Sequence, residues 1–281
     1  MRKFLGAIAG LVGIAVAVAG CGSSSTKTHS TAKTPAKHVK SKPSSGGMMS
    51  AMTGAKISVL SPTPGTVVHG NTVAWRVRLS DFKISCPAAG TSNKMGEGHV
   101  HVMLDGSLIN MFCSTSGTVS MQNIKPGMRT LTILAAENNH TDDMHSAKKV
   151  MFNYQPSHPL SVIKGQKKGA PSIKILSPAP GSTVHNGFAL TVAPTNFALS
   201  CALYGKPDVA GYGHWHINLD STTKGMMGMG TMLRMSCART FHVETADITP
   251  GRHTFFAILE DNQHAPTPHA QASVPVNVAK S

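Results

Sequence analysis

The sequence predicts an all-β protein made of two tandem β-sandwich domains, and three observations predict it. Apolar and polar residues alternate in stretches such as 73–79 and 254–259, and Pro/Gly turns interrupt them about every ten residues. Helical periodicity is nearly absent, and three blocks of sequence occur twice. Two copies of roughly 100 residues, each with about seven short strands, are typical of immunoglobulin-like sandwiches.

The chain begins with the pattern of a bacterial export signal. Met1-Arg2-Lys3 is cationic, 4–19 is apolar with interspersed glycines, and small residues precede Cys21. This order resembles the lipobox of bacterial lipoproteins, in which the cysteine thiol receives a diacylglycerol and the chain is cut just before it. The resemblance implies a signal peptide at 1–20 and a membrane anchor of acyl chains such as palmitate at Cys21. An uncleaved anchor helix is the alternative, and the short, glycine-rich run disfavours it.

Residues 21–55 are predicted to form a flexible, basic tether. They are mainly Ser, Thr, Lys, Pro, His and Gly, and no acidic residue precedes Asp81. Such a segment buries too little apolar surface to offset its chain entropy. The chain carries 26 Lys and Arg against 12 Asp and Glu, a formal charge of +14. A basic tether next to a membrane is attracted to an anionic envelope surface. Export argues against nucleic acid as a partner, and the sequence identifies no protein partner.

The repeated blocks set the domain organisation. They are 60–65 with 176–181, 98–105 with 213–220, and 126–140 with 250–264. The offset is 116, then 115, then 124, so the second copy has nine additional residues between its second and third blocks. The predicted organisation is a first sandwich at 56–155, a linker at 156–170 and a second sandwich at 171–281.

The five cysteines divide between one lipid site and two disulfides. With Cys21 assigned to the lipid, each copy retains two, and the repeat selects Cys86 with Cys113 and Cys201 with Cys237. Disulfides imply an exported protein in an oxidising compartment. Metal ligation by these thiols, as in blue-copper domains, is the alternative. The short spacing from Cys to His found at Cys237 and His242 is not matched in the first copy.

Five histidine positions recur in register between the copies. In each copy, two begin a strand with one residue between them, and two flank the turn after the neighbouring antiparallel strand. These four are expected to meet at one end of an outward sheet face as metal ligands. The predicted ligands are His99, His101, His140 and His145, and in the second copy His214, His216, His264 and His269. His69 and His185 are expected at the opposite end.

Three or four neutral imidazoles around one point suit Cu(II), Zn(II) or Ni(II), with copper bound most strongly. A copper or zinc ion is therefore the predicted cofactor. Its affinity is expected to fall as the pH drops through roughly 6, because the ordinary imidazole pKa is about 6.5. Asp105 and Asp220 are candidates for outer ligands or for acceptors of hydrogen bonds from ligands. The alternative is that the histidines only hydrogen-bond neighbouring loops.

Methionines form a second recurring group. Met111 and Met235 recur near the second cysteine of each copy, and the insertion carries Met226, Met227, Met229 and Met232. Thioethers favour Cu(I). Methionine also fills irregular packing, and a structural or flexible role for the Met-rich insertion is the simpler interpretation.

Short motifs in both copies resemble an uncharacterised family of bacterial envelope domains. That family has a Gly-His-x-His strand and, nearer the C-terminus, an acidic-Asn-x-His turn followed by a Pro-His pair. Here these are 213–216, 260–264 and 268–269; the first copy has Met144-His145 in place of Pro-His. The resemblance covers about half of each copy and implies an exported β domain with a histidine site.

The sequence predicts a binding protein and not an enzyme. Copper-zinc superoxide dismutase shares the β-sandwich, the His-x-His strand and the disulfide, but it needs six histidines and an aspartate. The stretch 103–127, where further ligands would lie, contains no histidine. No Gly-x-Ser-x-Gly or His-Glu-x-x-His motif occurs. The predicted function is a lipid-anchored envelope protein that binds a transition metal, copper first, for buffering or delivery. A non-metal adhesion or scaffold module is the alternative.

Overall fold

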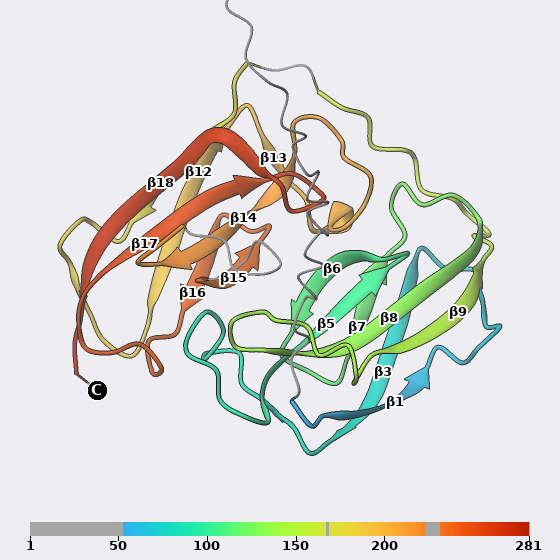
Figure 1. The fold of residues 1–281 in the computed structure, drawn as a ribbon. Coiled ribbons are helices and arrows are strands. Elements are labelled where there is room, and N and C mark those ends of the chain that lie inside the picture. Colours follow the sequence, from blue (N-terminus) through green and yellow to red (C-terminus); the bar gives the residue numbers. More distant parts are fainter. Residues whose placement is uncertain (1–52, 167–168, 223–230, 281) are drawn as a thin grey trace, which may run out of the picture. The chain divides into compact units, whose positions relative to one another are not determined.

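A computed structural model of the chain describes residues 53–166, 169–222 and 231–280. The predicted signal peptide, Cys21, tether residues 21–52 and Met226, Met227 and Met229 lie outside these residues. The predicted end of the tether at residue 55 is wrong, because Thr53 is buried and its amide donates to Asp143 Oδ2 at 3.0 Å. The described parts consist of strands and one short 3-10 helix, η1 (Cys201–Leu203), and they include no helix long and apolar enough to cross a membrane. The predicted fold class is confirmed: the protein contains two tandem immunoglobulin-like β-sandwiches (Figure 1).

The first sandwich contains β1 to β9. Its smaller sheet has the order β1-β3-β7, and its larger sheet has the order β2-β9-β8-β5-β4, with β6 also paired to β5. The strands are β1 (Lys56–Ser61), β2 (Val67–Val68), β3 (Thr72–Ser80), β4 (Lys83–Ile84), β5 (Glu97–Leu104), β6 (Ser107–Phe112), β7 (Ser116–Ser120), β8 (Gly127–Glu137) and β9 (Lys148–Tyr154).

The second sandwich repeats this plan with β10 to β18. The smaller sheet has the order β10-β12-β16, and the larger sheet has the order β11-β18-β17-β14-β13, with β15 also paired to β14. The strands are β10 (Ser172–Ser177), β11 (Thr183–Val184), β12 (Phe188–Thr195), β13 (Ala198–Leu199), β14 (Tyr212–Leu219), β15 (Met232–Ser236), β16 (Thr240–Val243), β17 (Gly251–Glu260) and β18 (Pro266–Val278).

Each sandwich has its own apolar core between its two sheets. The alternation of β3 buries Val73, Trp75 and Val77, because successive side chains of a strand point to opposite faces. In the second sandwich, Trp215 and Phe255 are fully buried in the equivalent core. A burial pattern with period two therefore explains why these segments form half-buried strands.

Each sandwich contains one disulfide. The structure pairs Cys86 with Cys113 and Cys201 with Cys237, the pairing that the repeat predicts. Part of the predicted linker lies against the first sandwich, since Gln122 donates a hydrogen bond to the Ser161 carbonyl at 2.8 Å.

Candidate metal centre

The central strands β5 and β14 each place two histidines on one face. His99 and His101 alternate with Val100 and Val102, and the two valines lie in the sandwich core as the sequence predicts. The face opposite the core is not exposed, however, because both histidines have 0% exposure. A buried cluster lies beside this face. It contains Cys86 and Ala89, residues of β6, and residues of β15 from the second sandwich. The histidines are therefore in an interior and not on an outer surface.

A tight turn after the neighbouring strand supplies the third histidine. His140 follows β8, which pairs antiparallel with β5, and its backbone has a φ of 65°. The equivalent residue, His264, follows β17 and has a φ of 64°. Both lie in the left-handed region, which non-glycine residues seldom adopt and which concentrates at functional sites. The same strained turn recurs in both copies and aims an imidazole at the His-x-His strand.

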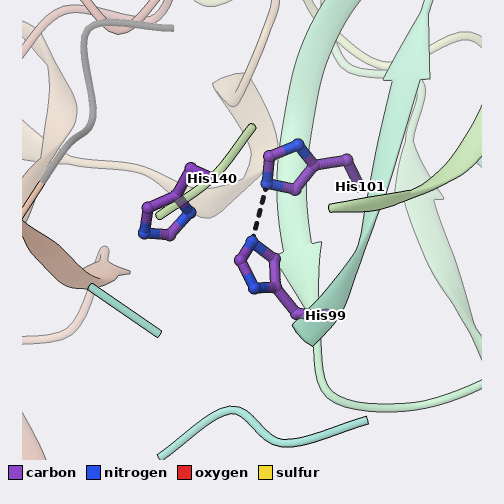
Figure 2. A group of neighbouring side chains, drawn as sticks. All are labelled: His99, His101 and His140. Atoms are coloured by element: carbon purple, nitrogen blue, oxygen red, sulfur yellow. Dashed lines mark hydrogen bonds between the residues drawn. The ribbon is translucent and has the colours of Figure 1, made fainter. Parts of the chain in front are cut away.

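The first triad consists of His99, His101 and His140, and all three are buried (Figure 2). The Nε2 atoms of His99 and His101 are 2.9 Å apart. The ring centroids of His99 and His140 are 4.6 Å apart. One nitrogen from each residue can be chosen so that all three lie within 4.8 Å of one another. These three imidazoles could hold a metal ion.

Hydrogen bonds outside the triad decide which ring nitrogens carry lone pairs. His101 Nδ1 donates to Asp142 Oδ1 at 2.7 Å, so its Nε2 is unprotonated in the neutral ring. His140 Nε2 donates to the Met232 carbonyl at 2.5 Å, so its Nδ1 keeps the lone pair. That Nδ1 is buried with no hydrogen-bond partner, and Figure 2 shows one nitrogen of His140 facing the other two rings. Orientation of a metal-binding imidazole by a carboxylate or carbonyl is a common feature of metal sites.

The second triad consists of His214, His216 and His264. Three nitrogens, Nε2 of His214, Nε2 of His216 and Nδ1 of His264, form a triangle with sides of 2.9, 3.0 and 3.4 Å. Since zinc–imidazole bonds are about 2.0–2.1 Å, nitrogens at these separations could all bind one metal ion.

The surroundings of the second triad also orient its rings. His216 Nδ1 lies 3.6 Å from Glu260 Oε1, and His264 Nε2 donates to the Leu108 carbonyl at 2.9 Å. Tyr204 packs edge-on against His214, with ring centroids 4.5 Å apart. The chemical plan of the first triad is therefore repeated: one imidazole faces a carboxylate and another is fixed by a carbonyl.

Burial favours the neutral form of four of these imidazoles, and the neutral form is the one that binds metals. Burial, followed by repulsion from His140 and His101, holds the pKa of His99 well below its usual range. Burial likewise lowers the pKa of His140 to about 3. In the second triad, burial lowers the pKa of His214 far, and lowers that of His264 as well. The expected loss of metal affinity through roughly pH 6 assumed the ordinary imidazole pKa, whereas the pKa of four of the six triad histidines is lowered.

Each sandwich supplies a backbone carbonyl that accepts a hydrogen bond from a histidine of the other sandwich's triad. His140 bonds to the carbonyl of Met232, and its repeat equivalent His264 bonds to the carbonyl of Leu108. Leu108 and Met232 are themselves equivalent, since both pairs are 124 residues apart. The contact is thus pseudo-symmetric, with the same surface used by both copies.

Glycines permit this close approach. Gly90 has a φ of +78°, and a Cβ there would lie 2.7 Å from the Met232 oxygen. Its equivalent, Gly205, has a φ of +62°, and a Cβ there would overlap the Leu108 oxygen. At both positions, therefore, a side chain would displace the carbonyl that orients the third histidine.

Several residues predicted from the sequence lie outside the triads. His145 and His269, expected as fourth ligands, are exposed and lie outside the groups that could hold a metal ion, whereas the triad histidines are buried or half-buried. His69 and His185 are exposed and also lie outside the triads, as expected.

The predicted carboxylates are replaced by two others. Asp105 bonds to Arg129 at 3.1 Å and Asp220 to His253 at 2.7 Å. The carboxylates beside the triads are Asp142 and Glu260. Sequence reasoning missed these roles, although Asp142 follows His140 by two residues and Glu260 belongs to the acidic-Asn-x-His motif.

No protein-family model and no curated protein matches the chain. Among solved structures, the fibronectin(III)-like modules of CbhA from Clostridium thermocellum align at 12% identity over 79% of this chain and 94% of theirs, with a TM-score of 0.26. Dpr2 Ig1-Ig2, solved with DIP-Theta, aligns at 14% identity over 80% and 100%, with a TM-score of 0.20. The BSP domain of a biofilm associated protein aligns at 10% identity over 80% and 29%, with a TM-score of 0.22. These likenesses are to β-sandwich modules, and we attach no functional argument to them.

Proposed function

We propose that this protein is an exported, lipid-anchored protein of the bacterial envelope that binds one transition-metal ion in each sandwich, with copper favoured, for metal buffering or delivery. The observation that carries the proposal is the direction of the lone pairs in the first triad. Asp142 and the Met232 carbonyl accept hydrogen bonds from His101 Nδ1–H and His140 Nε2–H, so the other nitrogen of each ring is unprotonated and faces His99. A neutral three-imidazole set suits Cu(II) and Zn(II).

The environment of the triads supports binding over catalysis. His99, His101 and His214 have no exposed surface, and the triads are covered by the contact between the sandwiches. A covered ion is retained and exchanges when the contact opens, which suits buffering or transfer. Lipid attachment at Cys21 would hold this activity at a membrane, and the basic tether would favour an anionic surface.

A metal-free scaffold is the second candidate, and one observation favours it. His140 and His264 bond across to the other sandwich, so the triads could serve only to join the two domains. Such a role needs polar cross-links but no ion.

Metal titration of the purified full chain distinguishes the two. We expect saturable binding of Cu(II) and of Zn(II) near two ions per chain, one for each triad. His101→Ala should abolish one site and leave the other. The control, His69→Ala, changes an exposed histidine outside the triads and should leave both. Absence of saturable binding, or equal losses from the two variants, would favour the scaffold.

A further inference from the structure

Buried methionine is concentrated in one place in the described residues. The buried methionines are Met111, Met121, Met232 and Met235. Only Met121 belongs to a sandwich core. The other three lie together in a small apolar cluster with Cys86, Ala89 and Leu108. Aliphatic and aromatic residues otherwise fill both cores, so the concentration of sulfur is specific to this cluster.

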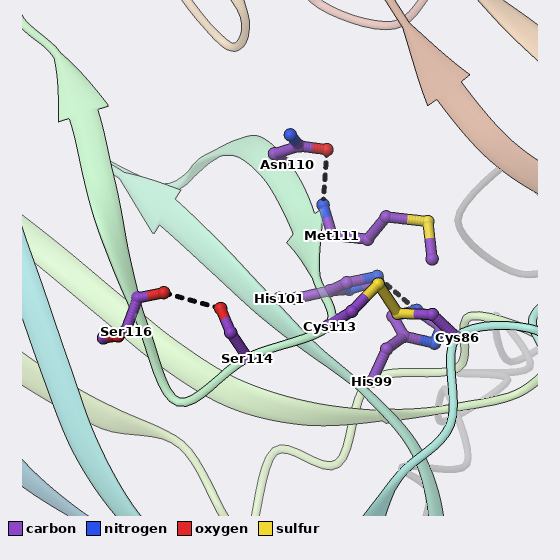
Figure 3. The surroundings of a disulfide bond; sticks show 8 residues. All are labelled: Cys86, His99, His101, Asn110, Met111, Cys113, Ser114 and Ser116. Carbon is purple, nitrogen blue, oxygen red and sulfur yellow. Dashed lines mark hydrogen bonds between the residues drawn. A yellow bond between two sulfur atoms is a disulfide. The ribbon is translucent and has the colours of Figure 1, made fainter. Parts of the chain in front are cut away.

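The cluster adjoins both histidine triads. Met111 is the cross-strand partner of His101, and Met235 is the cross-strand partner of His216. Directly paired residues share a face of the sheet, with their Cβ atoms about 5 Å apart. Figure 3 shows Met111 beside His101 and the Cys86–Cys113 disulfide. The third methionine, Met232, accepts the hydrogen bond from His140 through its carbonyl.

We propose that Met111, Met232 and Met235 form a thioether site for one Cu(I) ion between the two histidine triads. Thioethers are soft ligands that select Cu(I) over harder ions, whereas imidazoles suit Cu(II) and Zn(II). The three side chains are 4%, 0% and 7% exposed, so the sulfurs are shielded from water. The ion enters and leaves as Cu(I), and no electron transfer by the protein is involved.

The repeat makes this site asymmetric. Met111 and Met235 are equivalent, but the equivalent of Met232 is Leu108. Three sulfurs and one aliphatic side chain therefore meet where an exact duplication would place two matched pairs of residues. The inference deepens the proposed function, since it assigns a second oxidation state of copper to the region between the triads.

The test uses the purified full chain, loaded first with Zn(II) and then titrated anaerobically with Cu(I) in competition with bicinchoninate. Ascorbate maintains Cu(I) without reducing the disulfides. We expect Cu(I) to bind with sulfur neighbours in its X-ray absorption spectrum. The double variant Met111→Leu/Met235→Leu should weaken Cu(I) binding by about tenfold or more, because it removes two of three sulfurs at nearly constant volume.

The matched control is Met121→Leu, which removes a buried sulfur in the first sandwich core. It should leave Cu(I) affinity unchanged, and all three proteins should bind Zn(II) equally. Cu(I) with only nitrogen and oxygen neighbours in the unaltered protein, or equal Cu(I) affinity in the double variant and the control, would overturn the thioether site. If the unaltered protein bound Cu(I) with sulfur neighbours but did not bind Zn(II), the result would count against metal binding by the triads and not against the thioether site. The two outcomes are distinguishable because the X-ray absorption spectrum reports the sulfur neighbours of Cu(I) independently of Zn(II).

Discussion

Two carboxylates from different places in the repeat lie against equivalent histidines. Asp142 follows the turn of the first sandwich and bonds to His101, while Glu260 ends β17 and lies against His216. Pro266 occupies the position equivalent to Asp142, and Ala136 the position equivalent to Glu260. The two copies thus place a carboxylate beside the same imidazole nitrogen by different routes. A carboxylate there fixes the tautomer and strengthens the ring nitrogen as a metal ligand.

The first prediction concerns Asp142. Asp142→Asn should lower metal affinity at the first site by about 10-fold to 100-fold, because the uncharged amide supports His101 less well. The second site should be unaffected. The measurement is a two-site metal titration. Asp105→Asn serves as the control, since that carboxylate bonds to Arg129. Similar affinities in both variants would show that Asp142 does not orient a ligand.

The second prediction concerns acid stability of the metal-free protein. Burial lowers the folded-state pKa of His99, His140, His214 and His264, in the case of His140 to about 3. The unfolded chain then binds protons first as the pH falls below about 6.5. The contribution of these histidines to the free energy of unfolding is therefore complete above that pH. As the pH falls toward the folded-state pKa, it decreases by about 1.4 kcal/mol per pH unit for each such histidine.

The melting temperature of the metal-free protein should therefore decrease from pH 7 to pH 4. His140→Gln should make this decrease shallower, whereas the exposed control His69→Gln should not. A melting temperature independent of pH over this range would show that the triads are hydrated and not buried. Bound metal should oppose the decrease, because it stabilises the folded state.

At the scale of elements, two tight loops bring each triad together with the other sandwich. The turn after β8 presents His140, and the loop after β4 places Gly90 against the Met232 carbonyl. The Gly90 amide also donates to the Asn138 carbonyl at 2.6 Å, which ties this loop to the turn before His140. The equivalent bond joins Gly205 to Asn262 at 2.7 Å. Loop, turn and opposing strand therefore form one unit in each copy.

The third prediction tests this unit. Gly90→Ala should weaken metal binding at the first site, because its Cβ would press on the Met232 oxygen that orients His140. The matched control is Gly106→Ala, at a φ of +88° with no atom within 4 Å of a new Cβ. Both variants strain a left-handed residue, but only the first should change metal affinity. Equal effects in a titration would assign the loss to backbone strain alone.

At the scale of the whole molecule, the reciprocal bonds make the two sandwiches a functional pair. Each domain supplies three imidazoles to its own triad and a backbone carbonyl to the other. The second sandwich also contributes Tyr204 to the core cluster of the first. Loading of one triad should therefore stabilise the contact that shapes the other.

The fourth prediction concerns the anchor. Cys21→Ser should move the protein from the membrane fraction to the soluble fraction, because the proposed lipid attachment is through this thiol alone. Ser24→Ala is the control and should leave the protein membrane-bound. The measurement is fractionation followed by immunoblotting. Continued membrane association of Cys21→Ser with an uncut signal would favour an uncleaved anchor helix.

The sequence by itself determined the strands, the duplication and the identity of most triad members. Alternation with period two assigns Val100 and Val102 to the core, and the same period places His99 and His101 together on the opposite face. Because the repeat equates His140 with His264, it also marks a turn residue as part of each cluster. These features are local, and local patterns are what periodicity and repeats record.

Only the tertiary structure decided that the histidine face is buried. Alternation distinguishes two faces of a strand but does not tell whether a second domain covers the outer one. The burial of His101, the bond from His140 to Met232 and the sulfur cluster all depend on contacts between residues far apart in sequence. Those contacts determine which nitrogens stay neutral and where their lone pairs point, because desolvation and hydrogen bonding act through space and not along the chain.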